Sequence, residues 1–318
     1  MLWLALCSSE VIGMSSFDKA KVLVRIFGGL GNQLFCYAAA RRLALANNAK
    51  LVIDDISGFD FDIVYQRGYQ LDHFSIPCRK ATAAERLEPF SRVRRHLKRR
   101  WNMRRPFELR SYIQQEDIDF DPRLLTLRPK GRLYLEGYWQ GEGYFKDVES
   151  QIRDDLRITP PTDDQNQQMV QRIRNAPAVA VHVRFFDEPG TASGDGVKAN
   201  NAPGDYYQRA IAEMEQSVPS AHYFVFSDRP QEAKARLLLP ESRMSLVHHN
   251  QGDAMAYADL WLMTQCQHFI IANSTFSWWG AWLAAHPGKV VIAPVFEKRG
   301  GGTAWGFKGL LPSEWVAL

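Results

Sequence analysis

The sequence is poor in cysteine and has no long apolar run. Its four cysteines are Cys7, Cys36, Cys78 and Cys266. Their spacing fits neither a zinc site nor a redox pair, so we expect reduced thiols in a cytoplasmic protein. No run of roughly 18 or more apolar residues is present, and we predict no membrane-spanning helix. Residues 1–14 lack a basic start and contain Glu10, which argues against a signal peptide and leaves Met14 as an alternative start.

Several familiar catalytic motifs are also missing. No His-x-x-x-His or Cys-x-x-Cys pattern is present, and the sequence offers no argument for a metal site. No Gly-x-Ser-x-Gly elbow indicates a serine hydrolase. Asp-x-Asp pairs at 60–62, 117–119 and 119–121 resemble divalent-ion ligands, but none follows a clear central strand. We interpret them as surface acids and predict neither a metal nor a cofactor.

Residues 91–105 contain no acid, although they hold eight Lys or Arg. The formal net charge is +4, so the rest of the chain is net acidic. Such a block can dock on anionic lipid or nucleic acid, or form a solvated surface. Because Val93, Leu97, Trp101 and Met103 are interspersed, we predict peripheral contact with the inner face of a membrane, near a lipid-linked acceptor, and no nucleic-acid partner.

The N-terminal half begins with a βαβ pattern. We expect a strand, a tight turn, a helix and a second strand at 21–27, 28–33, 34–46 and 50–53. Gly29 and Gly31 fit the first two positions of a dinucleotide-binding fingerprint, and Asp54 lies where such folds hold a ribose. Leu34 occupies the third glycine position, so an NAD-binding oxidoreductase is an alternative with an incomplete motif.

The remainder of the chain divides at Pro160–Pro161. Residues 57–130 are predicted to be loops and short helices. A strand at 133–136 and helices at 145–156 and 162–174 surround the break. Beyond it, we expect strands at 178–184, 223–227, 245–248, 268–272 and 290–293. Helices are expected at 205–216, 231–238, 254–266 and 276–285. Alternating strands and helices indicate a parallel sheet, with lobes at 18–160 and 161–318.

Polar residues follow the strands of this second half, where ligands bind in parallel α/β sheets. His182 and Arg184 share one strand face and suit oxyanions, unless they form an exposed edge pair. Residues 268–284 predict a strand, a polar turn and a helix. The turn at 273–275 suits a phosphate at a helix N-terminus, although Ser and Thr also cap ordinary helices.

Four motifs together resemble the family-11 glycosyltransferases, the α-1,2-fucosyltransferases that use GDP-fucose. They are GGLGNQLF at 28–35 with Tyr37 and Ala38, VHVRFFD at 181–187, FSD at 226–228, and IANSTFSWWGAWL at 271–283. The resemblance covers almost the whole chain and keeps the family's motif order.

The resemblance implies an α/β fold of the GT-B type, with two Rossmann-like lobes and the donor site in the cleft between them. It further implies inverting, metal-independent transfer of fucose from GDP-fucose to a hydroxyl, galactose O2, of a glycan in surface polysaccharide synthesis. The implied catalytic residues are Arg184, His182 and Asp187. The implied substrate-binding residues are Gly29, Asn32, Gln33, Ser227, Asp228, Asp259, Ser274, Thr275 and Phe276.

Two positions separate this reading from its alternatives. The resemblance implies that Asp259 binds the guanine base. Its position early in a predicted helix, taken alone, favours an ordinary acidic residue that stabilises the first helical turn. Phe185 stands where the family has a second arginine. Strand alternation points Phe185 away from Arg184, so we expect it to pack rather than to touch phosphate. A non-catalytic glycan- or nucleotide-sugar-binding protein remains an alternative, and the general base, acceptor and linkage stay open.

Overall fold

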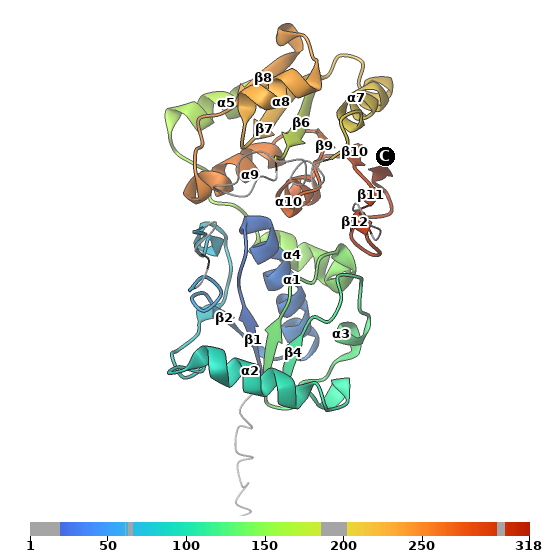
Figure 1. Cartoon of the computed structure of the whole chain (residues 1–318). Coiled ribbons are helices and arrows are strands. Elements are labelled where there is room, and N and C mark those ends of the chain that lie inside the picture. The colour runs from blue at the N-terminus through green and yellow to red at the C-terminus, as the bar shows by residue number, and fades with distance from the viewer. Residues whose placement is uncertain (1–19, 61, 63–65, 186–201, 298–302) are drawn as a thin grey trace, which may run out of the picture.

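The computed structural model describes residues 20–60, 62, 66–185, 202–297 and 303–318. Residues 1–14 and Asp187, which the sequence singled out, lie outside the described residues. Figure 1 shows two α/β lobes stacked along the long axis of the molecule. Among the described residues, no helix combines the length and the apolar character needed to cross a bilayer.

The N-terminal lobe contains a five-stranded parallel sheet in the order β3-β2-β1-β5-β4. Its strands are β1 (Lys21–Arg25), β2 (Lys50–Asp54), β3 (Arg79–Lys80), β4 (Tyr112–Gln114) and β5 (Arg132–Glu136). Its helices are α1 (Leu30–Ala46), α2 (Ser91–Asn102), α3 (Arg123–Thr126) and α4 (Glu149–Asp155). Helix α1 starts at Leu30, inside the predicted turn, because the Asn32 and Gln33 amides already donate to the Gly29 carbonyl.

The C-terminal lobe contains a six-stranded parallel sheet in the order β13-β10-β9-β6-β7-β8. Its strands are β6 (Ala178–Val183), β7 (His222–Ser227), β8 (Met244–Val247), β9 (His268–Ile270), β10 (Val291–Ala293) and β13 (Val316–Ala317). Its helices are α5 (Asp164–Arg174), α7 (Tyr206–Ser217), α8 (Pro230–Leu237), α9 (Ala256–Thr264) and α10 (Thr275–Leu283). A small hairpin pairs β11 (Phe296–Glu297) with β12 (Thr303–Trp305).

Short 3-10 helices lie in the connections of both lobes. They are Leu71–His73, Phe107–Leu109, Glu142–Tyr144, Lys146–Val148, Glu241–Arg243 and Asp253–Met255. The sequence did not predict β3, β4, β11, β12, β13 or the single long helix α2. Strands of two or three residues are too short for an alternating pattern, and α2 turns its apolar side chains outward, unlike a helix that packs on a core.

The two lobes share one continuous hydrophobic core. Phe35 of α1 lies 4.6 Å from the Trp278 ring and 4.9 Å from the Trp279 ring, both on α10. Phe145 stacks on Trp279 at 5.4 Å. These rings are fully buried, so the lobes are joined by an aromatic interface between α1 and α10 (Figure 1). Two lobes built on parallel sheets give the GT-B architecture that the family resemblance implied.

Gly31 marks the closest approach of the two lobes. A Cβ atom there would lie 2.4 Å from the backbone carbon of Thr275 and 2.5 Å from the nitrogen of Phe276. The second glycine of the GxG pattern is therefore needed for packing of α1 against the start of α10.

Gly31→Ala should destabilise the fold by about 1–3 kcal/mol, because two backbone segments would have to separate. Gly68→Ala is the matched control, since a Cβ at Gly68 would meet no atom within 4 Å. Thermal unfolding of both variants checks this. A Gly31→Ala protein as stable as Gly68→Ala would show that the lobes are not in contact here.

Candidate active site

A cleft of about 1020 Å³ lies between the lobes, at the carboxyl ends of the C-terminal strands. This is the position expected for a ligand in parallel α/β sheets. Among its lining residues are those that the sequence singled out: Gly29, Asn32, His182, Arg184, Ser227, Asp228, Asp259, Ser274, Thr275 and Phe276. Of the predicted site residues, Gln33 does not line it and Asp187 lies outside the described part of the chain.

Arg184 follows β6 and is held by a carboxylate from the neighbouring strand. Its Nη1 atom lies 3.3 Å from Oδ2 of Asp228, which follows β7. Oδ1 of Asp228 accepts a hydrogen bond from the Phe185 amide at 3.2 Å. Burial raises the pKa of Asp228, and Arg184 opposes that shift. Asp228 therefore orients the guanidinium toward the cleft and fixes the turn after β6.

Phe185 points away from the cleft, as strand alternation predicted. The half-buried ring packs against the second hydrophobic cluster of the C-terminal lobe. The guanidinium carbons of Arg229 and Arg236 each lie 5.8 Å from the ring centroid. Phe185 thus occupies a packing position beside two cations, and it is absent from the residues that line the cleft.

His182 is buried rather than on an exposed edge, and its ring is neutral near pH 7. Burial, with a smaller effect of Arg184, lowers the pKa of His182 to about 3. Its Nδ1 atom lies 2.9 Å from Oγ of Ser277, whose hydroxyl is also 3.3 Å from the Ser274 carbonyl. The histidine can therefore form a neutral hydrogen bond in the cleft, but it supplies no positive charge there.

The start of α10 is open to the cleft. Ser274 has an extended backbone at the N-cap position, but its side chain makes no capping hydrogen bond. The first amides of a helix have no partner within the helix, and this end carries partial positive charge. No acidic side chain occupies the first turn of α10. An ordinary cap is therefore not formed, and the arrangement suits an anion.

Asp259 lies in the first turn of α9 and also lines the cleft. Its Oδ1 atom accepts a hydrogen bond from Nδ2 of Asn250 at 2.8 Å. Asn250 is in turn bonded to Asn166, which Asp163 holds at the start of α5. Burial raises the pKa of Asp259 to about 7, with the Asn250 hydrogen bond acting in the opposite direction. A buried carboxyl held by an amide chain is poised to accept hydrogen bonds from a ligand.

The N-terminal lobe contributes a smaller set of polar groups to the cleft. Nε2 of Gln140 donates to Oδ1 of Asn32 at 2.9 Å, and both side chains line the cleft. Arg67 also lines it and lies beside Gly29, where a Cβ would be 3.4 Å from the guanidinium carbon.

Gln33, one of the predicted substrate-binding residues, does not lie in the wall of the cleft. Its side chain is fully buried, and Nε2 donates to the carbonyls of Gly28 and Gly68 at 2.9 Å each. Its Oε1 atom accepts from the Gln70 amide at 3.0 Å. All of these partners are loop backbone, so Gln33 fixes the loops around the cleft and does not face a ligand.

Residues around this cleft that the sequence analysis did not single out include Arg67, Gln140, Asn166 and Ser277. Arg67 and Gln140 lie in loops without periodicity, and their position depends on tertiary packing. Asn166 is distant in sequence from Asp259. Ser277 is the exception, because it lies one helical turn after Ser274 in the motif at 271–283 and could have been identified there.

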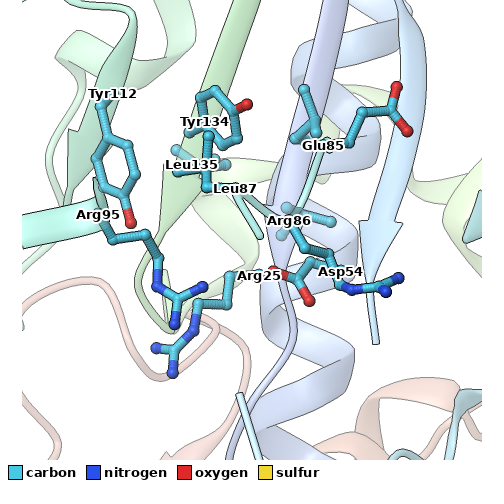
Figure 2. Close-up of a pocket in the computed structure, with 11 residues that line it drawn as sticks. Arg25, Asp54, Glu85, Arg86, Leu87, Arg95, Tyr112, Tyr134 and Leu135 are labelled. Carbon is cyan, nitrogen blue, oxygen red and sulfur yellow. The ribbon is translucent and has the colours of Figure 1, made fainter. Parts of the chain in front are cut away.

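A second hollow lies in the N-terminal lobe, between the sheet and α2. Its volume is about 10 Å³, enough for roughly one water molecule and too small for a sugar. Figure 2 shows Arg25 and Arg95 side by side at its edge. Nη1 of Arg25 bonds to Glu136 at 2.9 Å, whereas the buried Nη1 of Arg95 has no hydrogen-bond partner among the described residues.

Within the described ranges, no group of three or more His, Cys, Asp or Glu side chains is arranged to hold a metal. Asp121, from the predicted surface acids, instead pairs with Arg123 at 2.7 Å. The described cysteines, Cys36, Cys78 and Cys266, are free thiols.

A model of glycosyl transferase family 11 matches residues 21–299, almost the whole described chain. The chain belongs to glycosyl transferase family 11. It is 27% identical over 286 residues to the alpha-1,2-colitosyltransferase of Escherichia coli, covering 87% of this chain and 93% of that one. The O-antigen biosynthesis glycosyltransferase WbnK of Escherichia coli is 27% identical over 284 residues, covering 84% and 91%.

Solved structures similar to this family 11 glycosyltransferase include the NodZ alpha-1,6-fucosyltransferase soaked with GDP-fucose. It is 17% identical, covers 86% of this chain and 95% of that chain, and has a TM-score of 0.48. POFUT1 in complex with GDP-fucose is 15% identical, covers 87% and 98%, and has a TM-score of 0.47.

Proposed function

We propose that this glycosyltransferase moves fucose from GDP-fucose to O2 of a galactose in a surface glycan, with inversion and without a metal. The main support is that a single cleft gathers a guanidinium, an uncapped helix start and a buried carboxyl at the carboxyl ends of one parallel sheet. These groups match the diphosphate and the guanine of a GDP-sugar.

The diphosphate is assigned to Arg184 and the start of α10. Arginine presents a planar fork to phosphate oxygens, and the helix start adds amides and partial positive charge. Ser274 and Thr275 bring hydroxyls to the same point. Together they stabilise the negative charge that grows on the β-phosphate as the sugar leaves.

The base is assigned to Asp259. Its ionised carboxylate accepts hydrogen bonds from the N1–H and N2–H groups of guanine. Adenine offers no such pair of donors on one edge. Asn250, which also lines the cleft, holds the carboxylate in place through its hydrogen bond to Oδ1.

The reaction is a displacement at C1 of the sugar. The acceptor hydroxyl forms the new C1–O bond while the bond between C1 and the β-phosphate oxygen breaks, and GDP leaves with the electron pair. The hydroxyl proton passes to a base that we do not assign among the described residues. His182 contributes a neutral hydrogen bond beside the phosphate rather than a charge.

The acceptor is assigned to the N-terminal side of the cleft, near Arg67, Asn32 and Gln140. An O2 linkage and a surface glycan are supported by the relatives, which are named an alpha-1,2-colitosyltransferase and an O-antigen glycosyltransferase.

The oxidoreductase alternative is disfavoured by Gly31. In a dinucleotide-binding turn the glycines let the pyrophosphate approach the backbone. Here the space beside Gly31 is filled by the backbone of Thr275. A pyrophosphate cannot occupy the same place.

A donor and acceptor screen with mass-spectrometric readout tests the proposal. GDP-fucose with a terminal β-galactoside should yield a product heavier by one deoxyhexosyl unit, and the rate should survive excess EDTA because Arg184 and α10 supply the charge. Loss of activity in EDTA that manganese restores would remove the metal-free mechanism. GDP-sugar binding without any transfer would favour the non-catalytic alternative.

A further inference from the structure

Helix α2 is attached to the N-terminal lobe through its polar side. Arg99 forms an ion pair with Glu136 at the end of β5, its Nε lying 3.0 Å from Oε2. The buried Asn102 accepts hydrogen bonds from the amides of Ser111 and Tyr112 at 2.7 and 3.2 Å. Arg95 is buried beside the hollow of Figure 2. An ordinary surface helix does the reverse and turns its apolar stripe inward.

The outer side of α2 is apolar. Phe90, Val93, Leu97 and Trp101 recur at intervals of three and four residues, the spacing of one helix face, and they are 58% to 75% exposed. Met103, just beyond the helix, is also exposed. Among the described residues of the N-terminal lobe, Phe90, Val93, Leu97 and Trp101 are therefore four of the five most exposed large apolar side chains, and we call them the α2 stripe.

Cations flank the α2 stripe. Arg94, Arg100 and Arg104 are exposed, and no acid occurs between residues 91 and 105. The guanidinium carbon of Arg105 lies 4.8 Å from the Trp101 ring centroid, so it is held at the edge of the stripe. A helix with Trp, Phe and Leu on one face and Arg beside them is the pattern of an interfacial helix.

We propose that α2 is a membrane-binding helix that lies in the headgroup region of an anionic bilayer. The α2 stripe enters the acyl boundary, and the flanking arginines contact anionic headgroups. In Figure 1, α2 crosses the end of the N-terminal lobe away from the C-terminal lobe, so a bilayer there leaves the cleft between the lobes open.

Two other occupants fit the surface less well. A second copy would bring the same cationic block against itself, and like charges in contact oppose association. A nucleic acid would match the cations, but it would leave the α2 stripe in water. An anionic bilayer matches both the charge and the apolar surface.

Cosedimentation with vesicles tests the proposal. The full-length protein should bind phosphatidylcholine vesicles that contain phosphatidylglycerol, and bind far less to phosphatidylcholine alone or at high salt. Arg94→Gln, Arg100→Gln and Arg104→Gln should each weaken binding by about fivefold, the equivalent of about 1 kcal/mol per cation. Failure of the wild type to bind anionic vesicles at low salt would overturn the proposal.

Insertion of the α2 stripe into the bilayer is tested with a separate variant. Leu97→Glu combined with Trp101→Glu should reduce vesicle binding by more than about tenfold. Leu238→Glu is the matched control, since Leu238 is 76% exposed in the other lobe and should leave binding unchanged. Circular dichroism melting shows that each variant is folded. Equal loss in Leu238→Glu, or no loss in the double variant, would contradict insertion of the stripe.

Two further outcomes decide between occupants. Dimerisation that depends on Leu97, seen by analytical ultracentrifugation without vesicle binding, would assign the face to a second copy. Tight binding of RNA without vesicle binding would assign it to nucleic acid. These readouts measure binding and not turnover, so they stand apart from the donor and acceptor proposed above.

Discussion

Replacing Arg184 with alanine should lower kcat/KM for sugar transfer by about 10²–10³-fold, the usual loss when one preorganised donor to a developing oxyanion is removed. The guanidinium is the cationic group placed by Asp228 at the point where α10 begins. Arg184→Lys should recover little, because a point charge does not reproduce the planar fork. Initial rates with GDP-fucose and a galactoside acceptor measure the effect.

The neighbouring residue supplies the control. Phe185→Ala removes a half-buried ring that packs on the other face of the sheet, so it should lower the melting temperature more than the rate. Arg184→Ala should keep its melting temperature within a few degrees of the wild type. Near-normal turnover by Arg184→Ala would refute its assignment to the leaving phosphate, and an equal loss of rate in Phe185→Ala would point to a structural cause.

GDP binding should weaken by about tenfold for each pH unit below about pH 7, because burial raises the pKa of Asp259 to about 7. Guanine donates two N–H groups, and only the ionised carboxylate accepts both. Binding therefore favours the deprotonated form and lowers the pKa of Asp259 in the complex. The affinity is full above about pH 7 and falls as the pH drops toward the pKa of the complex.

ADP is the control ligand for this prediction. Its diphosphate titrates like that of GDP, so the ratio of the two affinities isolates the base. The preference for GDP over ADP should shrink as the pH falls, and Asp259→Asn should have a smaller preference that is independent of pH. Isothermal titration calorimetry at several pH values gives both constants. A preference for GDP that is constant between about pH 5 and 8 in the wild type would exclude Asp259 as the residue that recognises guanine.

Five strands of the C-terminal sheet, β6 to β10, could be predicted from the sequence because they are largely apolar runs. The β6 strand reads AVAVHV and is buried along its whole length, so its position followed from composition alone. The polar residues after β6, β7 and β9 then had to meet at one edge of a parallel sheet. The cleft brings together those residues, with Gly29 and Asn32 from the opposite lobe.

The N-terminal lobe was harder to predict for physical reasons. In α2 the apolar stripe faces outward while Arg95 and Asn102 are buried, so periodicity could not show which side packs. Gly31 must be a glycine because the backbone of Thr275, which is far away in sequence, packs against it. The residues next to Gly31 in the sequence do not reveal this contact. Gln33 belongs to a motif that implies substrate binding, yet its side-chain amide donates to the carbonyls of two loops.

Inverting transfer from GDP-fucose to galactose O2 leaves a product whose linkage and anomeric configuration can both be determined. Wild-type protein, GDP-fucose and a terminal β-galactoside are incubated in excess EDTA, and the product is examined by NMR. We predict an α-fucosyl unit on galactose O2, since displacement inverts the β-configured donor. A β-linked product, a linkage to another hydroxyl, or no product with any GDP-sugar would refute the proposed reaction.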